Sequence, residues 1–374
     1  MNLNIIIISQ EYKTANHQYL WHSMSLNDLN NDYLIIDIPA DLFITRIKKK
    51  GYRIREAKEG IKKINNNLFL IRPMFLLRPE SLPLLFFPCI AKKIIACIGK
   101  ELYLKKYEKI IILSYSAKWI KILKPSFRSF TYVYYLFDEV RADASTGKTN
   151  KNRLKYDIYA CRESDLVFSI SDALTNSRIS ECKRILTIGN GSNYSCQVDK
   201  KSIGYPKSFA FVGNFRSWID KNLLMQIVSN CSDLNFYIVG NIEKNMLPFF
   251  EELLLKQNVK YLGTFSKTDV KNIYQQFDCV IIPYLQNDFI YKTRPIKIVE
   301  SIFCGTPVVT IPVSGYQECS FIKFANNYLE FENQIRYFIN NKIDTESKEY
   351  KSFILSNSWD TIANNIIKKV HEII

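Results

Sequence analysis

The chain contains few of the residues that metal sites and disulfide frameworks require. Its 374 residues include only three histidines, and its nine cysteines are scattered singly with no Cys-x-x-Cys pair. Several cysteines lie within apolar runs, as Cys279 does in FDCVIIPY, which favours buried free thiols in a reducing cytosol. The sequence therefore predicts neither a disulfide framework nor a bound metal.

Long apolar runs are also missing. No segment reaches the about 20 apolar residues that a membrane-spanning helix needs, and the longest candidate, residues 82–98, is interrupted by two prolines and two lysines. The first residues, MNLNIIIISQEY, lack the basic start and long apolar core of a signal peptide and resemble a first buried strand. We therefore expect a cytoplasmic protein.

What is present is a globular composition with one strongly basic region. The chain is 47% hydrophobic and 23% charged, and its length suits two domains of ordinary size. The formal net charge is +15, and residues 46–128 alone hold 21 basic and 5 acidic side chains. Such an excess attracts the phosphates of nucleic acid, anionic lipid or a phosphorylated substrate. Because no nucleic-acid-binding motif accompanies it, nucleic acid is not the expected partner.

Within this basic region, residues 82–104 mix apolar side chains with lysines. One interpretation is a core helix with solvated lysines. The other is a helix that lies on anionic lipid, and the surrounding positive charge favours it. The residues expected near the membrane surface are Leu84, Leu85, Phe86, Phe87, Ile90, Ile94 and Ile98.

Two series of short β-branched and aromatic runs alternate with helical stretches, which predicts parallel α/β layers. The polar stretch 191–207 has the composition of a linker, so we expect one domain over residues 1–200 and a second over 201–355. Residues 356–374 form an amphipathic helix that is expected to pack across the domain junction. The expected strands are 4–9, 33–37, 68–71, 109–113, 131–136, 166–170, 185–188, 208–212, 235–239, 259–261, 279–282 and 307–310.

The most informative stretch is Phe277–Thr310. A buried strand and a polar loop lead to Pro295 at a helix start, where the missing N–H of proline costs nothing. Lys297 and Glu300 are three residues apart and share a helix face. Free N–H groups at a helix start together with a lysine form a phosphate site. A carboxylate one turn later can accept hydrogen bonds from both hydroxyls of a ribose.

This stretch resembles the donor site of the GT-B fold glycosyltransferases, whose pattern is a strand, a loop, P-x-K-x-x-E and then G-x-P-V-V. The segments FAFVGNFRSWIDKNLL, FYIVGN and KYLGTFSKTDV precede it in the family's order. The resemblance implies that the lysine and the helix start hold the nucleotide diphosphate, the glutamate holds the ribose and a glycine lets the backbone approach the phosphates. The implied donor-binding residues are Gly213, Asn214, Arg216, Gly240, Tyr261, Gly263, Arg294, Lys297 and Glu300.

The resemblance extends more loosely to the first half and implies a GT-B architecture: two Rossmann-like domains with a cleft between them, the first binding the acceptor. Strand 131–136 is followed by Asp138 and Glu139, at the strand end where open α/β sheets place their sites. Either carboxylate is a candidate general base; a helix cap or an ion pair with Arg141 is the structural alternative. His17 is a candidate acceptor contact or, equally, a structural histidine.

Many retaining members of this class carry a second glutamate eight residues before the ribose-binding one, where this chain has Lys292. We therefore expect an inverting transfer, with Asp138 as the base and Glu139 as the second candidate. The resemblance implies a nucleotide diphosphate sugar as donor and no cofactor.

The basic region beside an apolar helix favours a lipid-linked glycan acceptor on the inner face of a bacterial cell membrane. The protein would be peripherally bound there, in the synthesis of O-antigen lipopolysaccharide, capsule or wall polysaccharide. Two alternatives stay open. One is a nucleotide-sugar epimerase of the same fold, and the other is a non-catalytic polyanion-binding protein.

Overall fold

The computed structural model describes residues 1–9, 11–12, 15, 17–41, 60–77, 79–102, 104–193 and 204–374. The chain forms two compact units: unit 1 comprises Met1–Arg141, Thr149–Ile188 and Trp359–Ile374, and unit 2 comprises Ala142–Lys148 and Gly189–Ser358. Part of the basic region, residues 46–59, and part of the expected linker, residues 194–203, lie outside the described residues.

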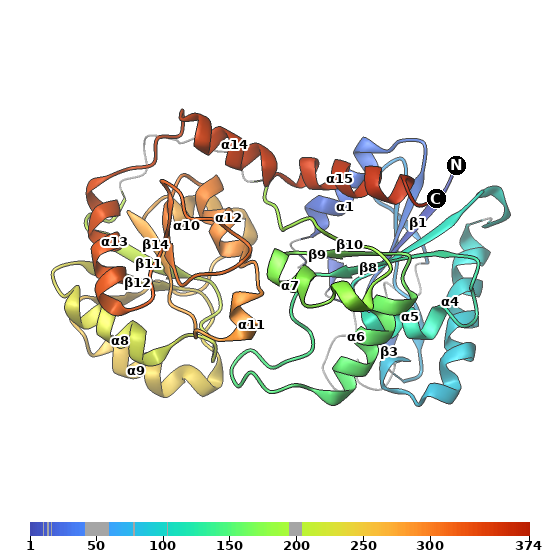
Figure 1. Ribbon diagram of the computed structural model, residues 1–374, viewed down its shortest axis with the longest axis horizontal. Helices are drawn as coiled ribbons and strands as arrows, with labels where there is room; N and C mark the ends of the chain where they lie inside the picture. The colour runs from blue at the N-terminus through green and yellow to red at the C-terminus, as the bar shows by residue number, and fades with distance from the viewer. Residues whose placement is uncertain are drawn as a thin grey trace. The chain divides into compact units, whose positions relative to one another are not determined.

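Unit 1 is built on an eight-stranded sheet of order β10-β9-β8-β7-β1-β2-β5-β4 (Figure 1). Its neighbouring strands are parallel except β4 and β5. The sheet grows from β1 toward β2 and from β7 toward β8, so the strand order reverses between β1 and β7. The strands are β1 (Leu3–Ile7), β2 (Asp32–Ile36), β4 (Lys62–Lys63), β5 (Leu68–Ile71), β7 (Ile110–Ser114), β8 (Thr131–Leu136), β9 (Leu166–Ser169) and β10 (Ile185–Thr187), with β3 (Ala40–Asp41) paired to β6 (Met74–Phe75) in a separate small sheet.

The helices of unit 1 include the C-terminal helix. Its apolar stripe is buried at Ile362, Ile366 and Val370, as the sequence periodicity predicts, and it packs alongside the first helix of the chain (Figure 1). Ser23 donates a hydrogen bond to Asp360 across this contact. The helices are α1 (Gln18–Asn27), α4 (Phe87–Glu101), α5 (Ala117–Leu123), α6 (Lys151–Glu163), α7 (Asp172–Asn176) and α15 (Trp359–His371).

Unit 2 contains a six-stranded parallel sheet of order β13-β12-β11-β14-β15-β16, whose strand order reverses between β11 and β14. Its strands are β11 (Ser208–Val212), β12 (Asn235–Val239), β13 (Val259–Tyr261), β14 (Cys279–Ile282), β15 (Val308–Thr310) and β16 (Ile322–Phe324). Its helices are α8 (Lys221–Asn230), α9 (Leu247–Leu254), α10 (Val270–Tyr274), α11 (Asp288–Tyr291), α12 (Ile296–Phe303), α13 (Tyr328–Asn340) and α14 (Lys348–Ser356).

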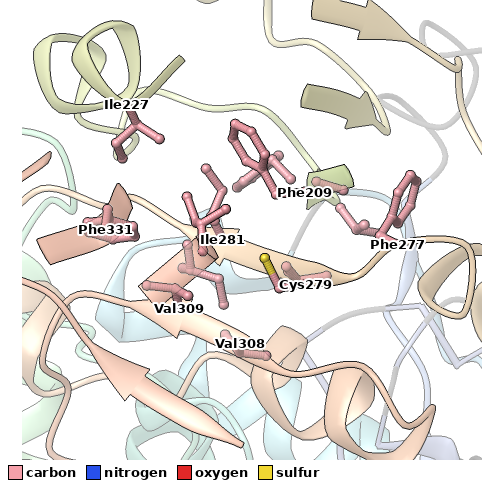
Figure 2. Close-up of a cluster of buried hydrophobic side chains, with 14 of the residues drawn as sticks. Phe209, Ile227, Phe277, Cys279, Ile281, Val308, Val309 and Phe331 are labelled. Carbon is pink, nitrogen blue, oxygen red and sulfur yellow. The ribbon is translucent and has the colours of Figure 1, made fainter. Parts of the chain in front are cut away.

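The core of unit 2 shows why these runs form strands. Phe209, Cys279 and Val308 come from three neighbouring strands and are fully buried, and Ile227 of α8 and Phe331 of α13 pack with them (Figure 2). Burying one such large apolar side chain stabilises the fold by about 1.5–3 kcal/mol. Burial also raises the pKa of the Cys279 thiol, so this cysteine is a protonated core residue, as its apolar context predicts.

The expectation that the apolar side chains of residues 82–104 lie near a lipid surface is wrong for those of α4. In α4 the side chains of Phe87, Ile90, Ile94 and Ile98 are buried, because this face packs against α5 and the rest of unit 1. The core-helix interpretation therefore holds for α4. The short 3-10 helix before it, η3 (Leu84–Phe86), exposes three large apolar side chains. Within the described residues, no helix is long and apolar enough to cross a membrane.

Candidate functional site

The carboxyl ends of β11 and β12 meet through two glycines. Gly213 follows β11 with φ of +127°, and Gly240 follows β12 with φ of +133°. The Gly213 N–H donates to the carbonyl of Val239 at 2.7 Å. A Cβ at Gly240 would lie 2.1 Å from the Gly213 oxygen, so the two backbones touch. This close approach requires glycine and leaves the strand ends without side chains.

Lys297 lies directly against this edge. It follows Pro295, the residue that precedes α12, and a Cβ at Gly213 would lie only 2.2 Å from its Cε. Its ammonium is 5.7 Å from the centroid of the Phe211 ring and 6.0 Å from that of Tyr284. Phe211 lies in β11 and Tyr284 follows β14, so the lysine is at the point where the strand order reverses, which is where α/β sheets bind ligands.

Lys297 has no ion-pair partner in the part of the chain that the structure describes. Among the described residues, no carboxylate lies within 4.0 Å of its ammonium. Lys297 lies in the first turn of α12, where the partial positive charge of the helix dipole adds to that of the lysine. The arrangement therefore suits a phosphate group.

Glu300 lies one turn further along α12. The opposite face of the helix is buried, with Ile298, Val299 and Ile302 in the core, whereas Lys297 and Glu300 are both half-buried. The predicted helix and the shared face of these two residues are thus present in the structure. Whether they bind a nucleotide remains a prediction.

The other expected donor residues of β11–β13 surround the same edge. Gly240 N–H donates to the carbonyl of Gly263 at 2.8 Å, and the Tyr261 hydroxyl donates to the Gly240 carbonyl at 2.9 Å. Asn214 is exposed beside them, and the guanidinium of Arg216 lies 5.1 Å from the Trp218 ring. Backbone hydrogen bonds therefore connect the ends of three neighbouring strands, β11, β12 and β13.

Arg294 is engaged within the scaffold of unit 2. Its guanidinium lies 4.5 Å from the centroid of the Tyr316 ring and donates to the side chain of Asn357. A Cβ at Gly189 would lie 2.9 Å from its Cζ. Because Arg294 directly precedes Pro295, these contacts fix the segment that leads into α12. They favour a positioning role for a residue that the resemblance places at the donor.

In unit 1, Asp138 lies just after β8. Its Oδ1 accepts a hydrogen bond from the Glu139 backbone N–H at 2.9 Å. Burial raises the pKa of Asp138 to about 6, and the neighbouring Glu139 carboxylate contributes in the same direction. No cation forms an ion pair with it among the described residues. A carboxylate with such a pKa is well suited to accept a proton near neutral pH.

Glu139 has a different environment. It is 5% exposed and forms an ion pair with Arg178 at 2.6 Å, and it accepts a hydrogen bond from the Arg141 backbone N–H. Arg178 and Arg141 both also contact Asp157, at 2.9 and 2.5 Å. Glu139 is thus part of a buried ion-pair network, which corresponds to the structural alternative, although the partner is Arg178 rather than the Arg141 side chain.

His17 precedes α1 and is surrounded by aromatic rings. The ring centroids of Tyr115, Tyr135 and Trp359 lie 5.2, 5.6 and 5.3 Å from its own. These surroundings favour a structural histidine over an acceptor contact.

The sequence did not point to a pocket of about 410 Å³ in unit 1. It lies where the strand order reverses: Ser9 follows β1, and Tyr115 and Ser116 follow β7. Lys118 of α5 and Arg153 of α6 also line it. The segment Ser-Tyr-Ser-Ala-Lys, which begins at the last residue of β7, was the available signal, since ligands bind at the carboxyl ends of central strands.

No group of three or more histidine, cysteine, aspartate or glutamate side chains is placed to hold a metal ion in the described part of the chain. The groups described above at the strand ends include cations, backbone amides and the Asp138 carboxyl group, whose pKa is raised.

Comparison with solved structures shows that this is the GT-B fold. The crystal structure of Anabaena Alr3699/HepE in complex with UDP matches with a TM-score of 0.66 at 16% identity, over 100% of both chains. A glycosyltransferase from Rickettsia africae matches with the same TM-score at 14% identity, over 100% of this chain and 98% of that one. Residues 206–341 match the model of the family described as glycosyl transferases group 1. The chain therefore has the GT-B fold, and residues 206–341 match the glycosyl transferases group 1 family, as the sequence resemblance implies.

One curated relative makes the relationship more specific. The Bacillus subtilis (strain 168) protein TuaH, named as a teichuronic acid biosynthesis glycosyltransferase, is 22% identical over 229 residues. This alignment covers 57% of this chain and 56% of TuaH, so the chain spans about half the length of that relative.

Proposed function

We propose that the protein transfers a sugar from a nucleotide diphosphate sugar to a lipid-linked glycan in the synthesis of a bacterial cell-surface polysaccharide. The observation that carries this proposal is the position of Lys297: an ammonium without a carboxylate partner among the described residues, against Gly213 and at the start of α12. Two further findings support it, since HepE was crystallised with UDP and TuaH is named for teichuronic acid synthesis.

The reaction assigns one task to each group. The α12 amides and Lys297 bind the diphosphate and stabilise the charge that develops on it as it leaves. The Glu300 carboxylate accepts hydrogen bonds from the hydroxyls of the ribose. Asp138 takes the proton of the acceptor hydroxyl, whose oxygen forms the new bond to the anomeric carbon while the bond from that carbon to the diphosphate breaks. The products are the extended acceptor, the nucleotide diphosphate and the protonated Asp138.

Release of nucleotide diphosphate tests this proposal. The full chain would be incubated with a panel of nucleotide diphosphate sugars, with and without bacterial lipid extract as the source of acceptor. We expect release from one donor that increases when lipid extract is added. Release that is independent of any acceptor, with an altered or hydrolysed sugar, would indicate the epimerase alternative. No release from any donor would support the polyanion-binding alternative.

The lipid-linked acceptor implies a membrane contact, and we propose that η3 provides it. Leu84, Leu85 and Phe86 are 58%, 72% and 44% exposed, which is unusual for three consecutive large apolar residues. Lys92 and Lys93, exposed on the helix that follows, add positive charge that anionic lipid headgroups attract. The apolar side chains would enter the headgroup layer while α4 itself stays in the protein core.

Flotation with phosphatidylglycerol liposomes tests the η3 contact. Replacing Leu84, Leu85 and Phe86 by serine is expected to reduce the liposome-bound fraction several-fold, and added salt is expected to reduce binding of the unmodified chain by screening. Leu255→Ser in unit 2 is the matched control, since Leu255 is 83% exposed and lies far along the chain from the basic region. Equal binding of the triple variant and the control would refute the contact, and stronger retention on heparin or duplex DNA than on liposomes would favour the polyanion-binding alternative.

A further inference from the structure

The pocket of unit 1 has a lining that is informative about its ligand. Its walls include Ile8, Tyr115 and Tyr134, which are 4%, 5% and 1% exposed and belong to the apolar core. Among the described residues, the charged side chains that line it are Lys118 and Arg153, both cationic. A volume of about 410 Å³ falls within the range of small-molecule sites. The pocket therefore combines an apolar interior with positive charge.

Lys118 is held in place by aromatic rings. Its ammonium lies 5.0 Å from the centroid of Tyr156 and 5.7 Å from that of Phe87. Tyr156 itself lines the pocket from α6, three residues after Arg153, and both lie toward one helix face. The two cations thus come from neighbouring helices, α5 and α6, which pack against each other. They place two cations beside the apolar interior.

This combination does not resemble a site for a sugar ring. Sugar hydroxyls require many hydrogen-bonding partners. Among the described lining residues, the uncharged polar side chains are Ser9, Ser116, Asn152, Tyr115, Tyr134 and Tyr156. The hydroxyls of Tyr115 and Tyr134 are already hydrogen-bonded to Trp21 and Asp157. An anion attached to a hydrocarbon chain fits better, because the chain gains from leaving water and the anion pairs with the cations.

We infer that this pocket binds the phosphate-bearing end of a hydrocarbon chain, with the phosphate at Lys118 and Arg153 and the first carbons of the chain on the apolar walls. This inference rests on the proposed function, since such a group is the anchor of a lipid-linked acceptor. Phe137 and Val140 line the pocket and flank Asp138 in the sequence. A glycan attached to the bound phosphate therefore begins close to the expected base.

Binding of short amphiphiles to the full chain, without any donor, tests the inference. The probes are farnesyl phosphate and dodecyl phosphate, which separate an isoprenoid from a linear chain, with farnesol and inorganic phosphate as the two halves of the ligand. In calorimetric titrations below the critical micelle concentration, we expect at least one amphiphile to bind at least tenfold more tightly than either half. Inorganic phosphate that binds as tightly as both amphiphiles would overturn the inference.

Lys118→Met is expected to weaken amphiphile binding about tenfold. The matched control is Lys121→Met, one turn along the same helix, where the ammonium lies 3.8 Å from the Tyr159 ring but does not line the pocket. A second variant, Ala117→Phe, fills the pocket from its wall and is expected to abolish binding. Thermal unfolding and nucleotide diphosphate binding verify that each variant is folded. Equal affinity of Lys118→Met and Lys121→Met would contradict the inference.

These measurements also separate the inference from the proposed function. If no amphiphile binds while sugar transfer to some acceptor proceeds, the pocket assignment is wrong and the transferase proposal stands. If amphiphiles bind as expected but no donor supports transfer, the pocket assignment stands and the proposed reaction is wrong.

Discussion

Asp138 and Glu139 are adjacent in sequence but have opposite electrostatic environments. Glu139 is stabilised as a carboxylate by Arg178, whereas burial without a cationic partner among the described residues raises the pKa of Asp138 to about 6. The acidic pair could be found from its position after a strand. Which of the two is suited to proton transfer could not, because Arg178 comes from a segment 39 residues away. These environments favour Asp138 over Glu139 as the predicted base.

Asp138→Asn is expected to lower turnover by ~10²–10⁴-fold, because a positioned base typically contributes that much. It is also expected to stabilise the protein at neutral pH. The pKa is raised from 3.8 to about 6, so the folded state binds more protons than the unfolded state between these values, and the stability linked to this group is lost as pH rises through that window. Thermal unfolding from pH 4 to 8 would show the difference, and the turnover of the unmodified enzyme should fall as pH drops below about 6.

Glu139→Gln is the contrasting control for this prediction. It leaves Arg178 buried without its carboxylate partner, and breaking a buried ion pair costs up to about 3–5 kcal/mol. A folded Glu139→Gln enzyme should keep its turnover. An active Asp138→Asn enzyme, or a stability that is unchanged from pH 4 to 8, would contradict the assignment.

Lys297→Ala and Glu300→Ala are each expected to weaken nucleotide diphosphate binding by ~10–100-fold. Losing a hydrogen bond to a charged group costs ~1.5–3 kcal/mol, and 1.4 kcal/mol corresponds to about tenfold in affinity. Calorimetric titration with UDP measures the change. Lys351→Ala is the control, since this lysine on α14 is exposed and pairs with the exposed Glu346. Unchanged affinity in both site variants would show that the nucleotide binds elsewhere.

Among the secondary-structure elements, those predicted well are the ones whose own residues carry a clear pattern of apolar and polar side chains. The central strands β8, β11, β12 and β14 begin and end at the predicted residues, because continuous apolar runs bounded by polar residues identify buried parallel strands. The two-residue strands and β16 were missed because their pairing depends on distant neighbours. For α4, the amphipathic helix was predicted correctly, but its apolar face packs in the protein core and not on lipid. Periodicity does not distinguish these two environments.

Gly240→Ala is expected to destabilise the protein more than Gly263→Ala, although both glycines have positive φ. A Cβ at Gly263 would meet nothing within 4 Å, so its cost is the backbone strain of about 1–3 kcal/mol. At Gly240 the Cβ would in addition overlap the Gly213 oxygen at 2.1 Å, which forces β11 and β12 apart. Thermal unfolding and UDP titration would compare the two variants. Equal losses would show that the contact of the strand ends is not required.

At the scale of the whole molecule, each unit carries its candidate site where the strand order of its sheet reverses. In unit 2 the lysine of α12 lies between β11 and β14, and in unit 1 the pocket lies between β1 and β7. The first could be predicted because helix, lysine and glutamate lie within one short stretch. The second could not, since its walls combine residues from Ile8 to Tyr156. Sugar transfer, which needs the predicted base of unit 1 and the predicted donor site of unit 2, therefore tests both site assignments together.

The configuration of the product provides that test. If Asp138 removes the proton as the acceptor oxygen attacks, a single displacement occurs and the anomeric configuration is inverted. The position eight residues before Glu300 is a lysine, Lys292, and therefore offers no carboxylate to the donor sugar. Its ammonium forms an ion pair with Asp288 at 2.5 Å. We expect the transferred sugar to have the configuration opposite to that of the donor, as measured by the anomeric coupling constant in NMR spectra. Asp138→Asn should bind UDP normally while its turnover falls, because the expected nucleotide contacts lie in unit 2. A product of retained configuration, together with an active Asp138→Asn enzyme, would exclude Asp138 as the base.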